Sequence, residues 1–281
     1  MPSDREVDDL LLPIDENLES RSYDVNPTFY PPAPDPFDLP DLSTMKIVVM
    51  CGGRGTRLGK RTESIPKVLT ELHGKPILDH KMNSYLEQGY DDFVLCTGYK
   101  SEMVEENAKQ YEGKCKVTIS NAGEEAGILK RLHTAMQDFE EDAILTYGDT
   151  LTDLDLIQLS SYHKEQGTEA TIVTAGIQNP FGLVEFDQNN RVTMFREKPV
   201  MKYYIGYAVI SKSSFQWVSD AITNLPDGAG LVTYFRMLMA MEQLSAWHHE
   251  GFQITFNTEK ELDQAQKASE TFFTLNESHG K

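Results

Sequence analysis

The sequence lacks several features, and each absence limits what the protein can be. It has no apolar run approaching the roughly 18 residues that a membrane-spanning helix needs. Its N-terminus is acidic, whereas a secretory signal peptide begins with basic and then apolar residues. The three cysteines, Cys51, Cys96 and Cys115, show no metal-ligand spacing, which is typical of small core residues in a reducing compartment. We therefore expect a cytoplasmic protein that does not bind membranes.

Basic residues are also few. Lysine and arginine total 26 against 44 aspartates and glutamates, giving a net charge of −18, which argues against a nucleic-acid-binding surface. Residues 1–44 hold eleven of the acids against Arg5 and Arg21, a net charge of −9, and eight of the 13 prolines. This composition predicts an acidic, proline-rich and disordered arm over 1–44, followed by one folded domain over 45–281.

The folded part opens with the segment Met45–Pro76, MKIVVMCGGRGTRLGKRTESIPKVLTELHGKP. Its apolar run 47–51 predicts a strand buried on both faces. Three glycines follow where the backbone must approach another group closely or adopt positive φ, and cations flank them: Gly52, Gly53 and Gly55, with Arg54, Arg57, Lys60 and Arg61. Bare N–H groups beside guanidinium groups are typical of a polyphosphate site. By itself the glycine pattern is equally typical of a simple connecting turn.

Beyond this loop, predicted helices alternate with apolar strands. We expect helices over 77–88, from Ser101 (which its own hydroxyl would cap), over 127–136 and over 156–165, with strands over 93–97, 115–120 and 143–147. This alternation predicts an α/β fold with a doubly wound, mostly parallel mixed sheet and ligands at the carboxyl ends of its strands. A small β-rich extension is predicted from strands over 168–175, 182–186, 191–195 and 204–210. Helices over 213–224 and 231–244, a strand over 253–256 and a polar helix complete the prediction.

Several longer strings carry a resemblance to a known family. GGRGTRL, IPKVLTELHGKPIL, YGD and the F-x-E-K-P segment Phe195–Pro199 resemble the signature of the sugar-1-phosphate nucleotidyltransferases. TYGD-x-x-x-DLD, G-x-LKR and WHHEGF are similar to the glucose-1-phosphate cytidylyltransferase branch. The resemblance covers Met45 to about Lys267. It implies a Rossmann-like fold and a direct, Mg²⁺-assisted transfer from an NTP, with CTP favoured, to a sugar 1-phosphate. The products would be an NDP-sugar and pyrophosphate.

Asp149 is the candidate metal ligand. It directly follows the predicted strand 143–147, and a carboxylate at the carboxyl end of a central strand suits Mg²⁺ shared with phosphate oxygens. Asp153 and Asp155, just beyond it, fit turn or helix-cap positions instead. The resemblance assigns the second metal ligand to Asn257, where the branch has Asp; an amide oxygen still coordinates Mg²⁺, with one charge fewer.

Fixed cations and a metal supply most of the catalysis of in-line attack on phosphorus, because negative charge grows on the leaving pyrophosphate. By resemblance Arg57 contacts the triphosphate and Lys67 the α-phosphate region. The nucleotide-binding set implied by the resemblance is Gly52, Gly53, Gly55, Thr56, Arg57, Gly127 and Asp149.

The acceptor residues implied by the resemblance are Glu197 and Lys198, which would hold the sugar and its phosphate, and Gly182 beside the sugar. The usual Asn-x-Gly of the sugar pocket is replaced here by Tyr204-Ile205-Gly206, which makes Tyr204 the fourth candidate acceptor residue, and the acceptor need not be glucose 1-phosphate. Two alternatives stay open: a cytidylyltransferase for a cyclitol phosphate, other non-sugar phosphate or phosphonate, and a catalytically silent ligand-sensing or partner-binding homologue. A homo-oligomer is expected.

Overall fold

The computed structural model describes residues 45–55, 58, 60–226 and 228–267. The predicted arm over 1–44 and the predicted site residues Thr56 and Arg57 lie outside the described residues. None of the described helices is long and apolar enough to span a membrane.

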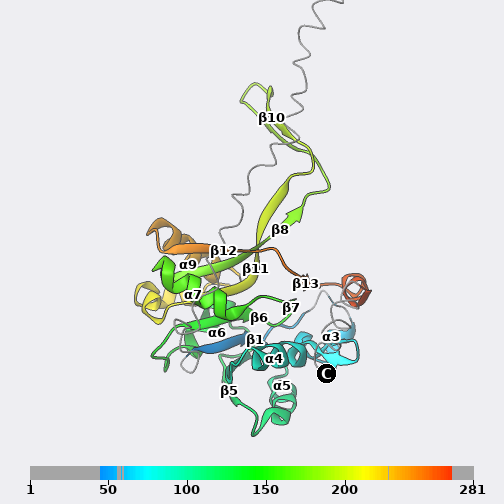
Figure 1. Cartoon of the computed structure of the whole chain (residues 1–281), viewed down its shortest axis with the longest axis vertical. Coiled ribbons are helices and arrows are strands. Elements are labelled where there is room, and N and C mark those ends of the chain that lie inside the picture. The colour runs from blue at the N-terminus through cyan, green and yellow to red at the C-terminus, as the bar shows by residue number, and fades with distance from the viewer. Residues whose placement is uncertain (1–44, 56–57, 59, 227, 268–281) are drawn as a thin grey trace, which may run out of the picture. The chain divides into compact units, whose positions relative to one another are not determined.

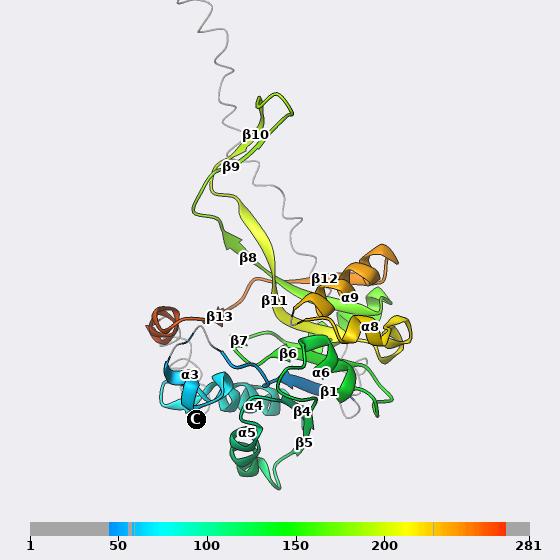
Figure 2. The same ribbon diagram turned by 180° about the vertical axis from the view of Figure 1, so that it is seen from behind.

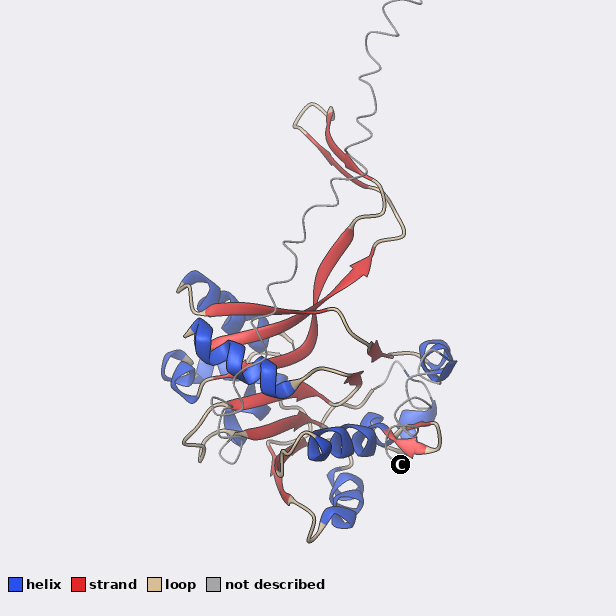
Figure 3. Ribbon diagram, viewed as in Figure 1, coloured by secondary structure: helices blue, strands red, loops and turns tan. Residues whose placement is uncertain are grey.

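The core is a seven-stranded sheet in the order β12-β8-β11-β6-β1-β4-β5 (Figures 1 and 3). Its strands are β1 (Lys46–Met50), β4 (Asp92–Thr97), β5 (Lys116–Asn121), β6 (Ala143–Tyr147), β8 (Ala170–Gln178), β11 (Val200–Ile210) and β12 (Leu244–His249). The neighbours in β6-β1-β4-β5 are parallel, β11 is antiparallel to both β6 and β8, and β12 is parallel to β8. The predicted mostly parallel mixed sheet is confirmed.

Helices cover both faces of this sheet because successive core residues of its strands point to opposite sides. In β1, Ile47 and Val49 join one buried cluster and Val48 joins the other. The first cluster includes residues of α4 (Ile77–Glu87), α5 (Ser101–Ala108) and α7 (Leu156–Gln166); the second includes residues of α6 (Ile128–Ala135) and α9 (Ala229–Ala240), beside α8 (Asp220–Thr223) (Figure 2). The doubly wound prediction therefore holds.

Short elements connect the layers and position the site. They are α3 (Lys60–Ser64), the 3₁₀ helices η2 (Lys67–Leu69), η3 (Lys109–Tyr111) and η4 (Lys212–Trp217), and the strands β2 (Glu71–Leu72), β3 (Lys75–Pro76), β7 (Thr150–Thr152) and β13 (Gln253–Thr255). Antiparallel pairing of β13 with β7 brings the end of the described chain beside the residues that follow β6. Residues 259–267 form the expected last helix.

Some local predictions were wrong. The expected helix over 231–244 ends at Ala240, and the residues from Leu244 form β12, an edge strand that sequence reasoning missed. Ser101 does not cap α5: the N-cap is Lys100, and the Ser101 hydroxyl is hydrogen-bonded to Thr97 Oγ1 (2.8 Å) and Glu105 Oε1 (2.7 Å).

The predicted β-rich extension is present as a long ribbon. Beyond the sheet β8 and β11 continue as a pair, with the hairpin of β9 (Leu183–Phe186) and β10 (Val192–Arg196) at the far end (Figures 1 and 2). We call residues 176–203 the β-arm. The pairing of β11 with β8 shifts register between Tyr204 and Ala208, around Gly206 at φ 80°. A Cβ at Gly206 would come within 2.6 Å of the Tyr147 ring, so this position requires glycine.

The cysteines behave as predicted for core residues. Cys51 and Cys96 are buried and Cys115 is half-buried, all three as free thiols. Burial raises the pKa of the Cys96 thiol to about 12, so it stays protonated and unreactive at neutral pH.

Candidate active site

A cavity of about 560 Å³ opens at the carboxyl ends of β1 and β6. Its walls are the loop after β1 (residues 51–55, the glycine loop), the loop before α6, the turn after β6 and the start of η2. The lining residues are Met50, Gly52, Gly53, Arg54, Gly55, Lys67, Val68, Glu124, Glu125, Ala126, Ile128, Arg131, Tyr147, Gly148 and Asp149. This is where a ligand of a doubly wound sheet is expected to bind.

The glycine loop is shaped by a buried arginine that the sequence analysis did not single out. Arg131, on α6 and 5% exposed, donates hydrogen bonds to the carbonyl oxygens of Thr97, Gly52 (3.4 Å) and Glu124 (3.0 Å). A Cβ at Gly52 or Gly98 would overlap its guanidinium group. The close approach predicted for Gly52 is therefore to Arg131, which places a fixed positive charge beneath the loop.

The two other glycines of the loop, Gly55 and Gly53, are in different environments. Gly55 adopts φ 61°, and a Cβ there would lie 2.9 Å from the Cβ of Lys67, so both conformation and space require glycine. A Cβ at Gly53 would meet nothing within 4 Å, and its backbone is exposed at the cavity. The loop thus exposes backbone groups at the cavity.

Three predicted site residues that are distant in sequence meet at one edge of the cavity. Lys67 Nζ lies 2.5 Å from Asp149 Oδ2 and 3.2 Å from Asn257 Oδ1. The Lys67 and Asp149 side chains are only 11% and 25% exposed, so their attraction is less screened by water than that of a surface pair. The ammonium group therefore bridges the two predicted metal ligands.

Asn257 is positioned by the start of the last helix. Its backbone N–H donates to Glu261 Oε2 (2.6 Å), and the Glu261 N–H donates to Thr258 Oγ1 (3.2 Å), side-chain contacts that cap the helix N-terminus. This cap fixes the backbone from which the amide side chain reaches Lys67.

The donors around Lys67 suit a hard divalent cation. Asp149 and Asn257 present a carboxylate and an amide oxygen to the same cationic atom, and Mg²⁺ takes oxygen ligands of this kind. Among the described residues no cluster of three or more His, Cys, Asp or Glu side chains could hold a metal ion. A metal at this place would complete its coordination with phosphate oxygens and water.

Arg54 closes the mouth of the cavity. Its guanidinium lies 3.1 Å from Glu124 and 2.9 Å from Glu125, and 5.6 Å from the centre of the Tyr99 ring. These ion pairs are largely exposed and add little to stability. Gly127, predicted in the nucleotide site, is the N-cap of α6, and its neighbours Ala126 and Ile128 line the cavity.

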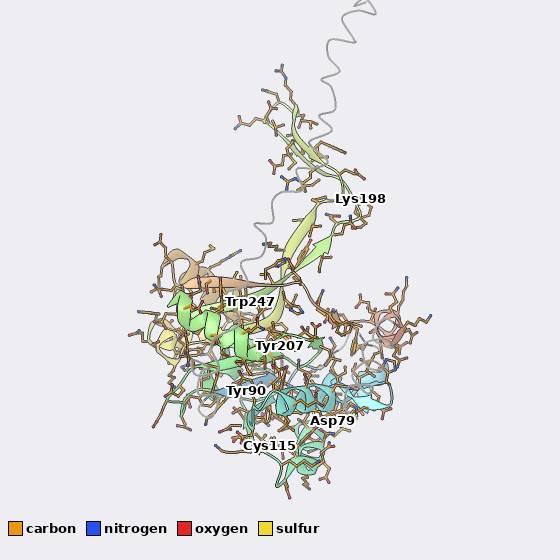
Figure 4. The ribbon with its side chains drawn as sticks, viewed as in Figure 1. Asp79, Tyr90, Cys115, Lys198, Tyr207 and Trp247 are labelled. Carbon is orange, nitrogen blue, oxygen red and sulfur yellow. The ribbon has the colours of Figure 1, made fainter. Side chains whose placement is uncertain are left out.

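The predicted acceptor residues lie elsewhere. Gly182, Glu197 and Lys198 belong to the β-arm, and none of them is among the described residues that line the cavity. A Cβ at Gly182 would lie 3.3 Å from Glu197 Oε2, so these two are together, and Figure 4 shows Lys198 well along the β-arm. The structure does not bring this group to Lys67 and Asp149 of the same chain.

Tyr204 is placed behind the cavity wall. Its ring packs edge-on against Tyr147 (5.8 Å between centroids), which lines the cavity, and against Phe235 (5.5 Å). Burial raises the pKa of the Tyr204 hydroxyl well above its usual range, so the group is neutral. In this arrangement Tyr204 supports the wall through Tyr147.

A cation-flanked glycine loop and a carboxylate at the adjacent strand end are together typical of a nucleotide-binding α/β enzyme. The chain belongs to the nucleotidyl transferase family, which it matches over residues 46–227. A glucose-1-phosphate cytidylyltransferase of Salmonella typhi is 30% identical over 236 residues, 74% of this chain and 89% of the relative. A mannose-1-phosphate guanyltransferase of Debaryomyces hansenii is 29% identical over 221 residues, 74% of this chain and 60% of the relative.

Solved structures show the same fold. HddC from Yersinia pseudotuberculosis superposes with a TM-score of 0.57 at 19% identity, covering 80% of this chain and 99% of that one. These similarities confirm the predicted family and enzyme class: the chain is a member of the sugar-1-phosphate nucleotidyltransferases, which bind nucleoside triphosphates and sugar phosphates. The relatives differ in the nucleotide that their names specify.

Proposed function

We propose that this protein transfers a cytidylyl group from CTP to a sugar 1-phosphate, giving a CDP-sugar and pyrophosphate. The observation that carries the proposal is the meeting of Lys67, Asp149 and Asn257 beside the glycine loop. An acceptor phosphate oxygen attacks the α-phosphorus of the nucleotide, a new P–O bond forms, and the bond to the β-phosphate oxygen breaks. The electron pair of that bond leaves with pyrophosphate.

The residues of this chain supply positioning and positive charge for that displacement. The glycine-loop N–H groups hold the triphosphate, Arg54 exchanges Glu124 and Glu125 for phosphate oxygens, and Lys67 neutralises the charge that develops around the α-phosphate. Asp149 and Asn257 would hold Mg²⁺. The chemistry that bound Mg²⁺ supplies is neutralisation of charge on the phosphate oxygens.

The preference for CTP rests on two supports. The TYGD-x-x-x-DLD and G-x-LKR strings are similar to those of cytidylyltransferases, and the Salmonella relative carries that name. Glu124 and Glu125, at the cavity, are hydrogen-bond acceptors that suit a base with an exocyclic amino group, as cytosine and guanine have and uracil and thymine lack.

Pyrophosphate release tests the proposal. The purified protein with Mg²⁺ is assayed with each common NTP against sugar 1-phosphates, cyclitol phosphates and simple phosphonates. We expect release with CTP and one sugar 1-phosphate. Release with GTP alone would show that the enzyme uses GTP in place of CTP. Release only with a non-sugar acceptor would favour the alternative acceptor class. No release at all, with NTP binding retained, would favour a ligand-sensing homologue.

We further propose that the protein is a homo-oligomer in which the β-arm reaches the cavity of a second copy. Nine of the thirteen exposed large apolar side chains among the described residues lie on the β-arm: Ile177, Phe181, Val184, Phe186, Val192, Phe195, Val200, Met201 and Tyr203. A single chain leaves this surface in water, which is typical of an interaction surface. The same ribbon carries Glu197 and Lys198, so a partner's β-arm would supply the acceptor residues that a chain's own cavity lacks.

Mixed oligomers test this arrangement. Asp149→Asn removes the proposed metal-binding carboxylate and Lys198→Ala removes the proposed acceptor-binding ammonium group, so each variant alone is expected to be inactive. Co-expressed with different affinity tags and purified through both, they are expected to regain activity, because some cavities then combine an intact Asp149 with a partner's intact Lys198. Doubly tagged oligomers without activity would show that the β-arm does not act between chains, and a monomer by analytical ultracentrifugation would exclude the oligomer.

A further inference from the structure

A buried lysine outside the cavity has no role in the displacement described above. Lys81, on α4, is 1% exposed and is among the largest fully buried side chains. Its ammonium group donates hydrogen bonds to the carbonyl oxygen of Thr150 and to the hydroxyl of Tyr207 (2.7 Å), and lies 4.6 Å from the centre of the Tyr207 ring. A buried charge is costly even when it is hydrogen-bonded, and an apolar side chain of similar volume is often as stable or more so. Stability alone therefore gives no reason for a lysine here.

The partners of Lys81 join four elements of the core. The Tyr207 hydroxyl, on β11, donates to the Thr150 carbonyl (3.1 Å) and lies 3.0 Å from the Tyr85 hydroxyl of α4. Tyr85 in turn donates to Thr146 Oγ1 on β6 (3.2 Å). Burial raises the pKa of Tyr85 well above its usual range, so its phenol is neutral. Figure 4 shows Tyr207 in the interior beside the strands that carry the site.

Thr150 connects this hydrogen-bond network to the active site, because it is the residue next to Asp149. Thr150 directly follows Asp149 and begins β7, so its peptide sets the direction in which the Asp149 side chain leaves the turn. On the other side, the Asp149 carboxylate is held by Lys67. Asp149 is thus held from two sides, through its side chain by Lys67 and through the following backbone by Lys81.

We infer that Lys81 is a positioning residue for Asp149: its ammonium group fixes the turn between β6 and β7 so that the carboxylate meets the metal and Lys67. This inference rests on the proposed function. Partners that orient a metal ligand typically contribute about 10- to 100-fold to metal affinity or activity. The positive charge of Lys81 is required for this task because it can bind the Thr150 carbonyl together with the Tyr207 hydroxyl, whereas an apolar side chain binds neither.

Lys81→Met tests the inference, since methionine keeps an unbranched side chain of similar length, one atom shorter, and removes the charge. The melting temperature is expected to be unchanged or higher, because Tyr207 still donates to the Thr150 carbonyl. We expect kcat to fall about 10- to 100-fold and the dissociation constant of Mn²⁺ for the nucleotide-bound protein, measured by electron paramagnetic resonance, to rise about tenfold. KM for the nucleotide is expected to stay within about twofold, since the glycine loop is untouched.

Two further variants keep the test decisive. Tyr85→Phe removes a hydroxyl of the same network that is hydrogen-bonded to Thr146 and Tyr207 and not to Thr150, and it is expected to leave kcat and Mn²⁺ affinity unchanged. Tyr207→Phe removes the hydroxyl that Lys81 binds and is expected to lower kcat, as Lys81→Met does. It therefore tests the inference even if Lys81→Met does not fold. A lower melting temperature with unchanged kcat and Mn²⁺ affinity in Lys81→Met and Tyr207→Phe would show a purely structural role. If the wild type releases no pyrophosphate, the proposed function fails, and the Mn²⁺ comparison still decides whether Lys81 positions Asp149.

Discussion

Asp149→Ala is expected to abolish measurable turnover, a loss of about 10³-fold or more in kcat, while the fold remains. The Asp149 carboxylate contacts the Lys67 ammonium group at the cavity, and the same ammonium group contacts Asn257. Without the carboxylate the proposed metal site has one amide oxygen and no charge. The measurement is pyrophosphate release at saturating substrates, with circular dichroism and thermal melting to check the fold.

Asp155→Ala is the matched control in the same TYGDTLTDLDL segment. Asp155 is the N-cap of α7 and accepts a hydrogen bond from the Gln158 N–H (2.9 Å), as the sequence predicted for a cap position. Its loss is expected to lower the free energy of unfolding by about 1 kcal/mol and to leave kcat unchanged. Turnover of Asp149→Ala within tenfold of the wild type would contradict the role assigned to this carboxylate.

Much of the fold could be predicted because its signals are local. Each predicted strand over 47–51, 93–97 and 143–147 is a short apolar run, and each is found within one residue in the central sheet. The strand β12 was missed because its sequence, LSAWHH, lacks an apolar run. The strand is defined by its pairing with β8. Trp247 is buried there and packs edge-on against Tyr162 of α7, a contact that depends on the tertiary structure.

In the candidate site, too, the features with a local sequence signal were predictable and those that depend on tertiary contacts were not. The glycine loop and Asp149 were predictable because each directly follows a strand whose carboxyl end had to face the cavity. The role of Arg131 was not predictable, because it depends on hydrogen bonds to carbonyl oxygens such as that of Gly52, 79 residues away in sequence. The placement of Lys198 was not predictable either: its motif gives the chemistry of the side chain, whereas its position on the β-arm depends on how β8 and β11 pair beyond the sheet.

The charges around the cavity explain how an acidic protein can accept a triphosphate. The chain carries a net charge of −18, but Arg131 and Lys67 place positive charge against the glycine loop and the strand end, each held by contacts inside the protein. Arg54 adds a third cation at the mouth. Glu124, Glu125 and Asp149 balance these cations in the described lining, so a triphosphate would gain Arg54 and Lys67 by displacing the acids that now pair with them. Distant surface charge matters less, because water and salt screen it within about 10 Å.

Lys67→Met is expected to show two opposite effects. Turnover should fall by about 10³-fold, because the cation that neutralises charge at the α-phosphate is removed. Affinity for a metal ion alone should rise, because Lys67 Nζ stands between Asp149 Oδ2 (2.5 Å) and Asn257 Oδ1 (3.2 Å) and repels a second cation there. The dissociation constant of Mn²⁺ without nucleotide is expected to fall roughly tenfold.

Lys75→Met is the control for this pair of measurements. Lys75 lies in the same cation-rich segment, on β3, but is not among the described residues that line the cavity, so neither turnover nor Mn²⁺ affinity should change. Unchanged Mn²⁺ affinity in Lys67→Met would mean that the ammonium group and the metal do not compete, and that the metal ligands lie elsewhere. Weak Mn²⁺ binding in the wild type that becomes strong in Lys67→Met implies that the metal normally enters with the triphosphate, whose negative charge draws Lys67 away from Asp149.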